Sequence, residues 1–123
     1  MKYALLVYES PEAVNARNDP ALAPAYWASY MAYSKALAEA GVAAGGAGLQ
    51  APAMGTTLRI RGDQRQVQDG PFADTKEQLG GFFLVDVPDL DAALKWAARC
   101  PSAANGSVEV RPVLPPPDQL PRG

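Results

Sequence analysis

The sequence predicts a single α+β domain of the split βαβ type, in which a four-stranded antiparallel sheet carries both main helices on one face. Two observations support this prediction. Segments with strand and helix character follow one another in the order β-α-β, hairpin, β-α-β, and right-handed crossovers place both helices on the same side of the sheet. The chain has 123 residues, 48% of them hydrophobic, which suits one domain with its own core. We expect this domain over residues 1–113, followed by a Pro-rich tail over 114–123.

The first half of the chain predicts a strand, a helix and a glycine-rich strand. Residues 2–9 are apolar at both sets of alternating positions, which indicates a strand covered on both sides. After a segment with several prolines over 11–24, aromatic and apolar residues recur at helical spacing over 25–40, and Gly41 should end that helix. Residues 42–49, rich in alanine and glycine, should form the second strand.

The second half begins with an inserted hairpin. Residues 56–61 and 65–69, joined through Gly62 and Asp63, predict two polar strands and a tight turn. Residues 81–87 then form a strand that is apolar on both faces, like the first strand.

Asp89 is placed to cap a helix over residues 90–100, which Pro101 ends. We expect this helix to bury Leu90, Ala93, Leu94 and Ala97. Residues 107–113 predict the last strand. Cys100 stands alone, so no internal disulfide can form, and we interpret it as a small buried hydrophobe.

The two-sided apolar strands predict a homodimer. Helices cover one face of the sheet only, and each large apolar side chain left in water on the other face would forgo about 1.5–3 kcal/mol. Monomeric proteins rarely expose a patch of several such residues. A second copy of the chain, joined sheet to sheet, would cover it.

Composition argues against several classes of partner. The net charge is −2 and the basic residues are scattered, unlike the clustered positive surface that binds nucleic acid directly. The N-terminal apolar run is too short for a signal peptide, and no run reaches the roughly 18 apolar residues of a membrane span. We therefore expect a cytoplasmic protein. The chain has no histidine and one cysteine, so we expect no metal and no cofactor. A carboxylate-only magnesium site would need Asp69, Asp74 and Glu77 to converge.

The segment from Asp69 to Phe82 is the strongest candidate for a functional loop. Gly70 can adopt positive φ and Pro71 fixes φ near −65°, so the loop can hold polar side chains in a set geometry. The candidate ligand-binding residues in it are Gly70, Pro71, Phe72, Thr75, Lys76, Glu77 and Gln78. Asp69 is a candidate general base, or else the first residue of an Asx-type turn. Thr75 to Gln78 could equally form one short polar turn.

This loop, Asp69-Gly70-Pro71-Phe72-Ala73-Asp74-Thr75-Lys76-Glu77, resembles the signature of the DGPF proteins within the YCII-related superfamily. Further resemblance lies in Met1-Lys2-Tyr3, in Gly45-Gly46 with Leu49-Gln50, and in residues 86–94 and 106–112. It implies a ferredoxin-like α+β fold that dimerises, of the dimeric α/β-barrel type, and for some members an extracytoplasmic-function sigma factor as partner. The resemblance extends to better-studied YCII relatives, in which a His and Asp pair is proposed as catalytic. This chain contains no histidine, so that pair cannot form here.

The last strand alternates differently from the other core strands. Val108, Val110 and Pro112 form an apolar face, whereas Glu109 and Arg111 share the other face. If the valines pack on the helices, the charged pair points to the side where a second copy would lie. Arg111 could anchor an anionic group and Glu109 could act as an acid or base. The alternative is an inter-subunit salt bridge.

Two functional hypotheses follow. The first is a homodimer that binds a small polar or anionic metabolite, with possible turnover, in a cavity lined by the 69–78 loop, Glu109 and Arg111. The second is a regulatory module that contacts a sigma factor through the hairpin or the tail. We interpret the aromatic series Trp27, Tyr30 and Tyr33 as core, the alternative being an aromatic ligand box.

Overall fold

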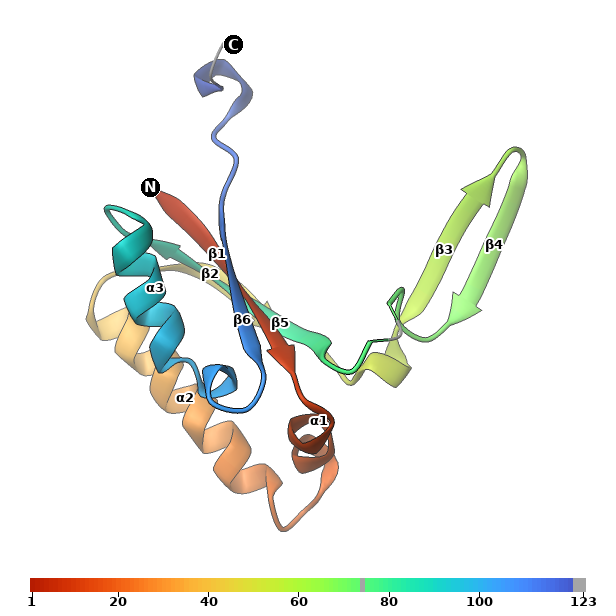
Figure 1. Ribbon diagram of the computed structural model, residues 1–123, viewed down its shortest axis with the longest axis horizontal. Coiled ribbons are helices and arrows are strands. Elements are labelled where there is room, and N and C mark those ends of the chain that lie inside the picture. Colours follow the sequence, from red (N-terminus) through yellow and green to blue (C-terminus); the bar gives the residue numbers. More distant parts are fainter. Residues whose placement is uncertain (74, 121–123) are drawn as a thin grey trace.

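A computed structural model describes residues 1–73 and 75–120 as one α+β unit (Figure 1). Its main elements are β1 (Lys2–Glu9), α1 (Pro11–Asn18), α2 (Ala23–Glu39), β2 (Ala43–Gly48), β3 (Thr56–Arg61), β4 (Gln64–Asp69), β5 (Gln78–Asp86), α3 (Leu90–Arg99) and β6 (Ser107–Pro112). The four-stranded sheet has the order β2-β5-β1-β6, with every neighbouring pair antiparallel. This confirms the split βαβ arrangement with an inserted hairpin, because β3 and β4 pair only with each other.

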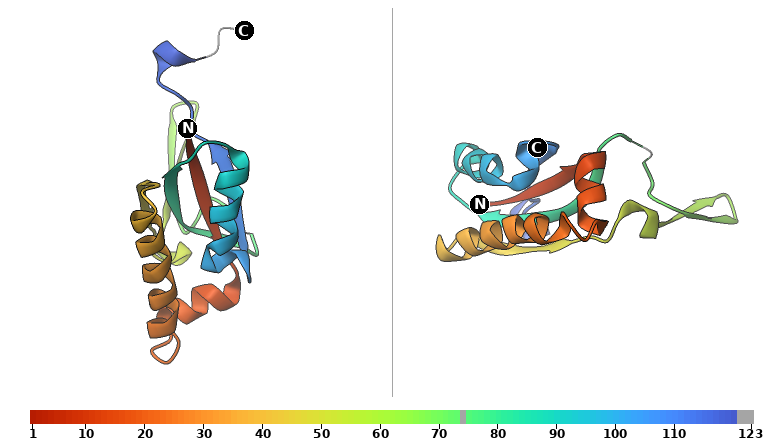
Figure 2. Two further views of the ribbon diagram at one scale, coloured as in Figure 1. Left: turned by 90° about the vertical axis from the view of Figure 1, so that its left-hand side faces the viewer. Right: turned by 90° about the horizontal axis from the view of Figure 1, so that it is seen from below.

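Helices α2 and α3 lie side by side on one face of the sheet (Figure 2). The core between these layers contains Tyr3, Leu5, Val7 and Val85 from the strands, with Tyr33, Leu37, Ala93 and Ala97 from the helices. The Tyr33 hydroxyl donates a hydrogen bond of 2.7 Å to the backbone carbonyl of Trp96, which joins the two helices. Cys100 is buried, as predicted.

Local signals explain where the helices begin and end. The Asp89 side chain accepts a hydrogen bond of 2.9 Å from the backbone N–H of Ala92 and caps α3, as predicted. Gly41 follows α2 with a φ of 72°, the left-handed conformation expected after a helix. The prediction that Leu90 and Leu94 are buried is wrong, because α3 turns its alanines to the sheet and leaves both leucines exposed.

Helix α1 lies in the segment over 11–24 that the sequence analysis left without structure. Its start carries a recognisable signal: the Ser10 side chain accepts from the backbone N–H of Ala13 at 3.2 Å, Pro11 opens the helix and Glu12 follows in the first turn.

The hairpin β3–β4, which we call the arm, projects away from the body (Figure 1). It stands on the side of the sheet opposite α2 and α3 (Figure 2). Its turn at Gly62, with a φ of 64°, is the one predicted. After β6 the tail also leaves the body and contains a short 3₁₀ turn over Pro117–Gln119.

Candidate functional site

Glu9, the last residue of β1, is the most deeply buried charged side chain among the described residues, with 1% of its surface exposed. Alternation along β1 puts it on the same face as Tyr3, Leu5 and Val7, toward the helices. From its place at the end of the first strand, Glu9 could face the cavity expected from sequence, but it is not among the site residues selected there. An acidic residue that continues an otherwise apolar face was the available signal.

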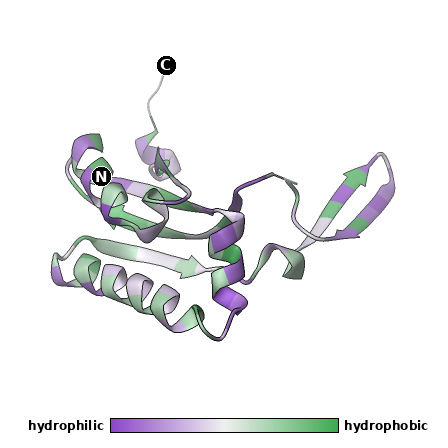
Figure 3. Cartoon of the chain, turned by 60° about the horizontal axis from the view of Figure 1, so that its bottom comes forward, coloured by the Kyte–Doolittle hydropathy of each residue, from purple (hydrophilic) through white to green (hydrophobic). Residues whose placement is uncertain are grey.

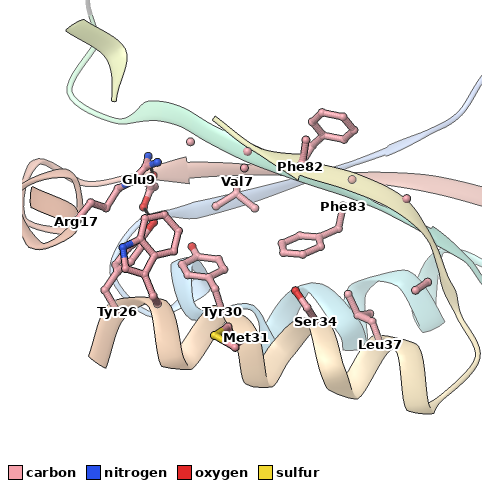
Figure 4. A pocket seen from close by; sticks show the side chains of 18 residues that line it. Val7, Glu9, Arg17, Tyr26, Tyr30, Met31, Ser34, Leu37, Phe82 and Phe83 are labelled. Atoms are coloured by element: carbon pink, nitrogen blue, oxygen red, sulfur yellow. Dashed lines mark hydrogen bonds and ion pairs between the residues drawn. The ribbon is translucent and has the colours of Figure 1, made fainter. Parts of the chain in front are cut away.

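Two side chains from different helices pair with this carboxylate (Figure 4). Arg17 of α1, whose side chain is 7% exposed, donates from Nη1 to Oε1 of Glu9 at 2.9 Å. The Tyr26 hydroxyl of α2 donates to the other carboxylate oxygen. Arg17 also donates to the backbone carbonyl of Leu49 and lies 5.3 Å from the ring centroid of Trp27. Helix α1 therefore positions a guanidinium at the end of β1, where Glu9 would otherwise be a lone buried charge.

Glycine at position 80 makes room for Glu9. The pairing of β1 with β5 shifts register between Val7 and Tyr8, which leaves Gly80 as the extra residue of a β-bulge. A Cβ on Gly80 would lie 1.9 Å from Oε1 of Glu9, and one on Gly81 would lie 2.8 Å from the carbonyl oxygen of Ala47. The glycine pair thus serves a bulge and a close strand approach.

A cavity of about 660 Å³ opens from this cluster between α2 and the β2–β5 edge of the sheet. Figure 4 shows Glu9 and Arg17 at one end, with Tyr30 and Phe83 pointing between the sheet and α2. The rings of Tyr30 and Phe83 are stacked with centroids 6.5 Å apart. The walls also include Trp27, Met31, Ser34 and the glycine-rich backbone over 45–48. The interpretation of the aromatic series as core is confirmed for Tyr33, which is buried, and for Tyr30, which packs against the core and also lines the cavity. It is wrong for Trp27, which is 43% exposed and lines the cavity.

The hydroxyl groups of the cluster are held in their protonated, donating form. Burial, reinforced by the hydrogen bond to Glu9, raises the pKa of Tyr26 far above its usual value. Burial raises the pKa of Tyr30 to about 12. At neutral pH the site thus combines a guanidinium, two phenol donors and one carboxylate within an otherwise apolar wall. Such a set can hold a polar group of a small molecule and exchange a proton with it.

The loop predicted from sequence lines a second cavity, also of about 660 Å³, at the base of the arm. Pro71, Phe72, Thr75, Glu77 and Gln78 contribute to its wall together with Tyr8, whereas Asp69, Gly70 and Lys76 do not. Asp74 lies outside the described residues.

Hydrogen bonds within this loop favour the alternative of a polar turn. The Gln78 side-chain amide donates to the carbonyls of Ala73 and Thr75, at 3.1 and 2.7 Å, and the Thr75 hydroxyl donates to the carbonyl of Glu77 at 2.6 Å. The polar side chains thus mainly order the loop itself.

Glu109 and Arg111 lie on the face opposite the helices, since they pair in register with Leu6 and Ala4. This is the side that the sequence predicts for them, and in the single chain the Arg111 side chain is 66% exposed on the edge strand β6. Their place in one cavity with the loop and a second copy stays a prediction. Arg111 pairs with Glu109 at 2.5 Å, and this bond raises the pKa of Arg111. Glu77 of the loop reaches this strand, accepting from the Ser107 hydroxyl at 2.7 Å. Acid–base roles for Asp69 and Glu109 stay predictions.

Within residues 1–73 and 75–120, no three His, Cys, Asp or Glu side chains gather closely enough to hold a metal ion. Burial raises the pKa of the Cys100 thiol, as expected for a packed residue. Across the same residues no helix has the length and apolar character to cross a membrane.

Fold and site together define a small α+β protein with a ligand-sized cavity on the helical side of its sheet. The chain belongs to the YCII-related domain family, whose model matches residues 1–116. It is 50% identical over 68 residues to an uncharacterized protein of Rhizobium meliloti, a match that covers 53% of this chain and 55% of that protein. The chain thus spans about half the length of this relative.

A solved structure with a similar fold is 5-chloro-2-hydroxyhydroquinone dehydrochlorinase from Burkholderia phenoliruptrix, in complex with 2,5-dihydroxybenzoquinone. The TM-score is 0.50 and the sequence identity 17%, over 92% of this chain and 93% of that one. At this identity the likeness concerns the fold alone.

Proposed function

We propose that the protein binds a small metabolite in the cavity beside Glu9, with an apolar, flat body against the aromatic walls and a polar or anionic group toward Arg17 and Tyr26. The observation that carries this proposal is the buried Glu9–Arg17 pair at the end of an apolar cavity. A buried ion pair generally contributes little to stability, because desolvation offsets its attraction. Its position beside an open cavity of ligand size favours a role in recognition.

The three side chains have distinct parts in this proposal. Arg17 offers a fixed positive group for an anionic or carbonyl oxygen, and Tyr26 offers a hydroxyl donor. Glu9 is the acid–base group, because a ligand hydroxyl that displaced the Tyr26 hydroxyl would meet a free carboxylate oxygen. If the protein turns its ligand over, we propose proton transfer to or from a small cyclic or conjugated molecule.

A ligand screen tests this proposal. Small aromatic acids, phenols and hydroxyquinones are suitable probes, the last because a protein of similar fold was solved with 2,5-dihydroxybenzoquinone. We expect hits by native mass spectrometry and calorimetry, with at least about a tenfold loss of affinity in Tyr26→Phe and in Glu9→Gln, since each removes a hydrogen bond involving a buried charge. Glu109→Gln is the matched control, because that carboxylate lies outside the cavity. Hits that bind all three variants equally would refute the site.

We also propose that the protein is a homodimer joined through the face of the sheet opposite the helices, which we call the open face. Leu6, Tyr8, Phe82 and Leu84 belong to this face by their pairing in the sheet. Figure 4 shows Phe82 pointing away from α2, whereas Phe83 points toward it. A second copy would remove these side chains from water. Sedimentation equilibrium measures this directly.

The Asp69 to Phe72 signature further supports a place in the DGPF branch of the family, which we retain as a proposal. The sigma-factor partner implied by that resemblance stays a prediction. Recovery of a stoichiometric sigma factor on affinity purification from the source cell would support it.

A further inference from the structure

The arm presents an apolar surface to solvent. Leu58, Ile60 and Val67 are 53%, 63% and 55% exposed, and the register Leu58↔Val67 and Ile60↔Arg65 puts all three on one face of the hairpin. Figure 3 shows hydrophobic positions alternating with hydrophilic ones along β3. A hairpin of two strands is marginally stable in water by itself, so an apolar face on such a hairpin is typical of an element that packs on another surface.

Hydrogen bonds close the base of the arm. The backbone N–H of Gly70 donates to the carbonyl of Gly55 at 2.7 Å, and the Thr57 hydroxyl donates to the carbonyl of Gly70 at 3.1 Å. The Arg59 guanidinium lies 5.1 Å from the ring centroid of Phe72. Gly70 has a φ of 103°, a conformation that favours glycine. The turn from Gly70 to Phe72 thus closes the two strands of the arm at its base, which gives the predicted functional loop a structural role.

The direction of the arm identifies what it can reach. The arm and the open face lie on the same side of the sheet, opposite α2 and α3 (Figure 2). A second copy seated on the open face would therefore lie beside the arm. The charge of the arm is opposite in sign to that of the whole chain, which favours a second copy as the partner. Residues 57–68 contain three arginines and one aspartate, whereas the whole chain has a net charge of −2. A basic arm would thus meet a body with an acidic balance.

We propose that the arm clasps a second copy of this chain, with Leu58, Ile60 and Val67 packed on the partner while the partner's arm does the same in return. This inference rests on the homodimer proposed above. Two-fold symmetry makes the contact reciprocal, so both arms contribute buried area to the interface. A stable interface buries about 800 Å² per partner. The two arms would add to the area that the small open face buries by itself.

The test compares variants on the two faces of the arm by sedimentation equilibrium. The double variant Leu58→Glu with Val67→Glu should raise the dimer dissociation constant by about a hundredfold or more, because two apolar contacts become charged. Gln66→Glu with Gln68→Glu adds the same charge on the polar face of β4 and should leave the constant within about threefold. Circular dichroism shows whether each variant stays folded.

Two further measurements separate the possible results. If Leu84→Glu on the open face dissociates the dimer but the arm variant does not, the arm inference fails and the sheet-to-sheet dimer stands. A wild-type chain that remains monomeric at every accessible concentration overturns both. Hydrogen exchange on the unmodified protein needs no variant: amides over 57–68 should gain protection as concentration rises through the dissociation constant. Unchanged exchange in a sample shown to dimerise would overturn the arm inference.

Discussion

Substitution of Gly80 by alanine should displace Glu9 from its site. The added Cβ would lie 1.9 Å from Oε1, 2.6 Å from Cδ and 2.9 Å from Cγ of Glu9, so no small rotation of the carboxylate relieves the overlap. Gly80 does not have a positive φ, which means that alanine is compatible with the backbone and the clash is the main effect. The Glu9 side chain must leave, and its bonds to Arg17 and Tyr26 are lost.

The magnitude follows from these contacts. Breaking a buried ion pair costs about 3–5 kcal/mol when one charge stays behind. Here the cavity lets water reach Arg17, and replacing glycine lowers the entropy of the unfolded chain, which returns about 0.4–1 kcal/mol. We therefore expect a loss of ~2–4 kcal/mol in the free energy of unfolding. Urea denaturation followed by circular dichroism measures this change.

Gly48→Ala is the matched control, because Gly48 lies in the neighbouring strand β2 and a Cβ there would meet no atom within 4 Å. A double-mutant cycle identifies the cause: in a Glu9→Ala background, Gly80→Ala should cost less than ~1 kcal/mol. If Gly80→Ala and Gly48→Ala destabilise the protein equally, the argument that Gly80 makes room for Glu9 is refuted.

Three other perturbations give further tests. Arg17→Leu should destabilise the protein by about 3–5 kcal/mol, and adding Glu9→Gln should recover most of this loss, because an unpaired buried charge is the cost; no recovery in thermal unfolding would contradict the pairing. Stability should fall as pH rises from 10 toward 12, because the pKa of Tyr30 is 10.0 when unfolded but about 12 when folded, and burial raises the pKa of Tyr26 and Tyr33 as well; Tyr30→Phe should make that part of the pH profile less steep, and an unchanged slope would argue against the shift at Tyr30. Arg111→Ala should leave the stability of the isolated chain unchanged within experimental error, since solvent screens its exposed pair with Glu109; a clear drop in the urea midpoint would mean that Arg111 contributes more than this pair explains.

Sequence by itself determined the order of the strands and of helices α2 and α3, but not helix α1. Hydrophobic alternation and helical spacing located the strands and α2, while Asp89, Gly41 and Gly62 marked a cap, a helix end and a turn through short-range geometry. These features depend on residues only a few positions apart, which is why pattern analysis finds them.

Only the tertiary structure decided which side chains meet. Glu9, Arg17 and Tyr26 come from three elements, and Gly80 joins them through a bulge between strands far apart in the chain. The strand order placed Glu109 and Arg111 on an edge strand, outside both the cavity beside Glu9 and the cavity that the loop lines. Register and strand order arise from packing over the whole core, so no local pattern of residues specifies the site that they create.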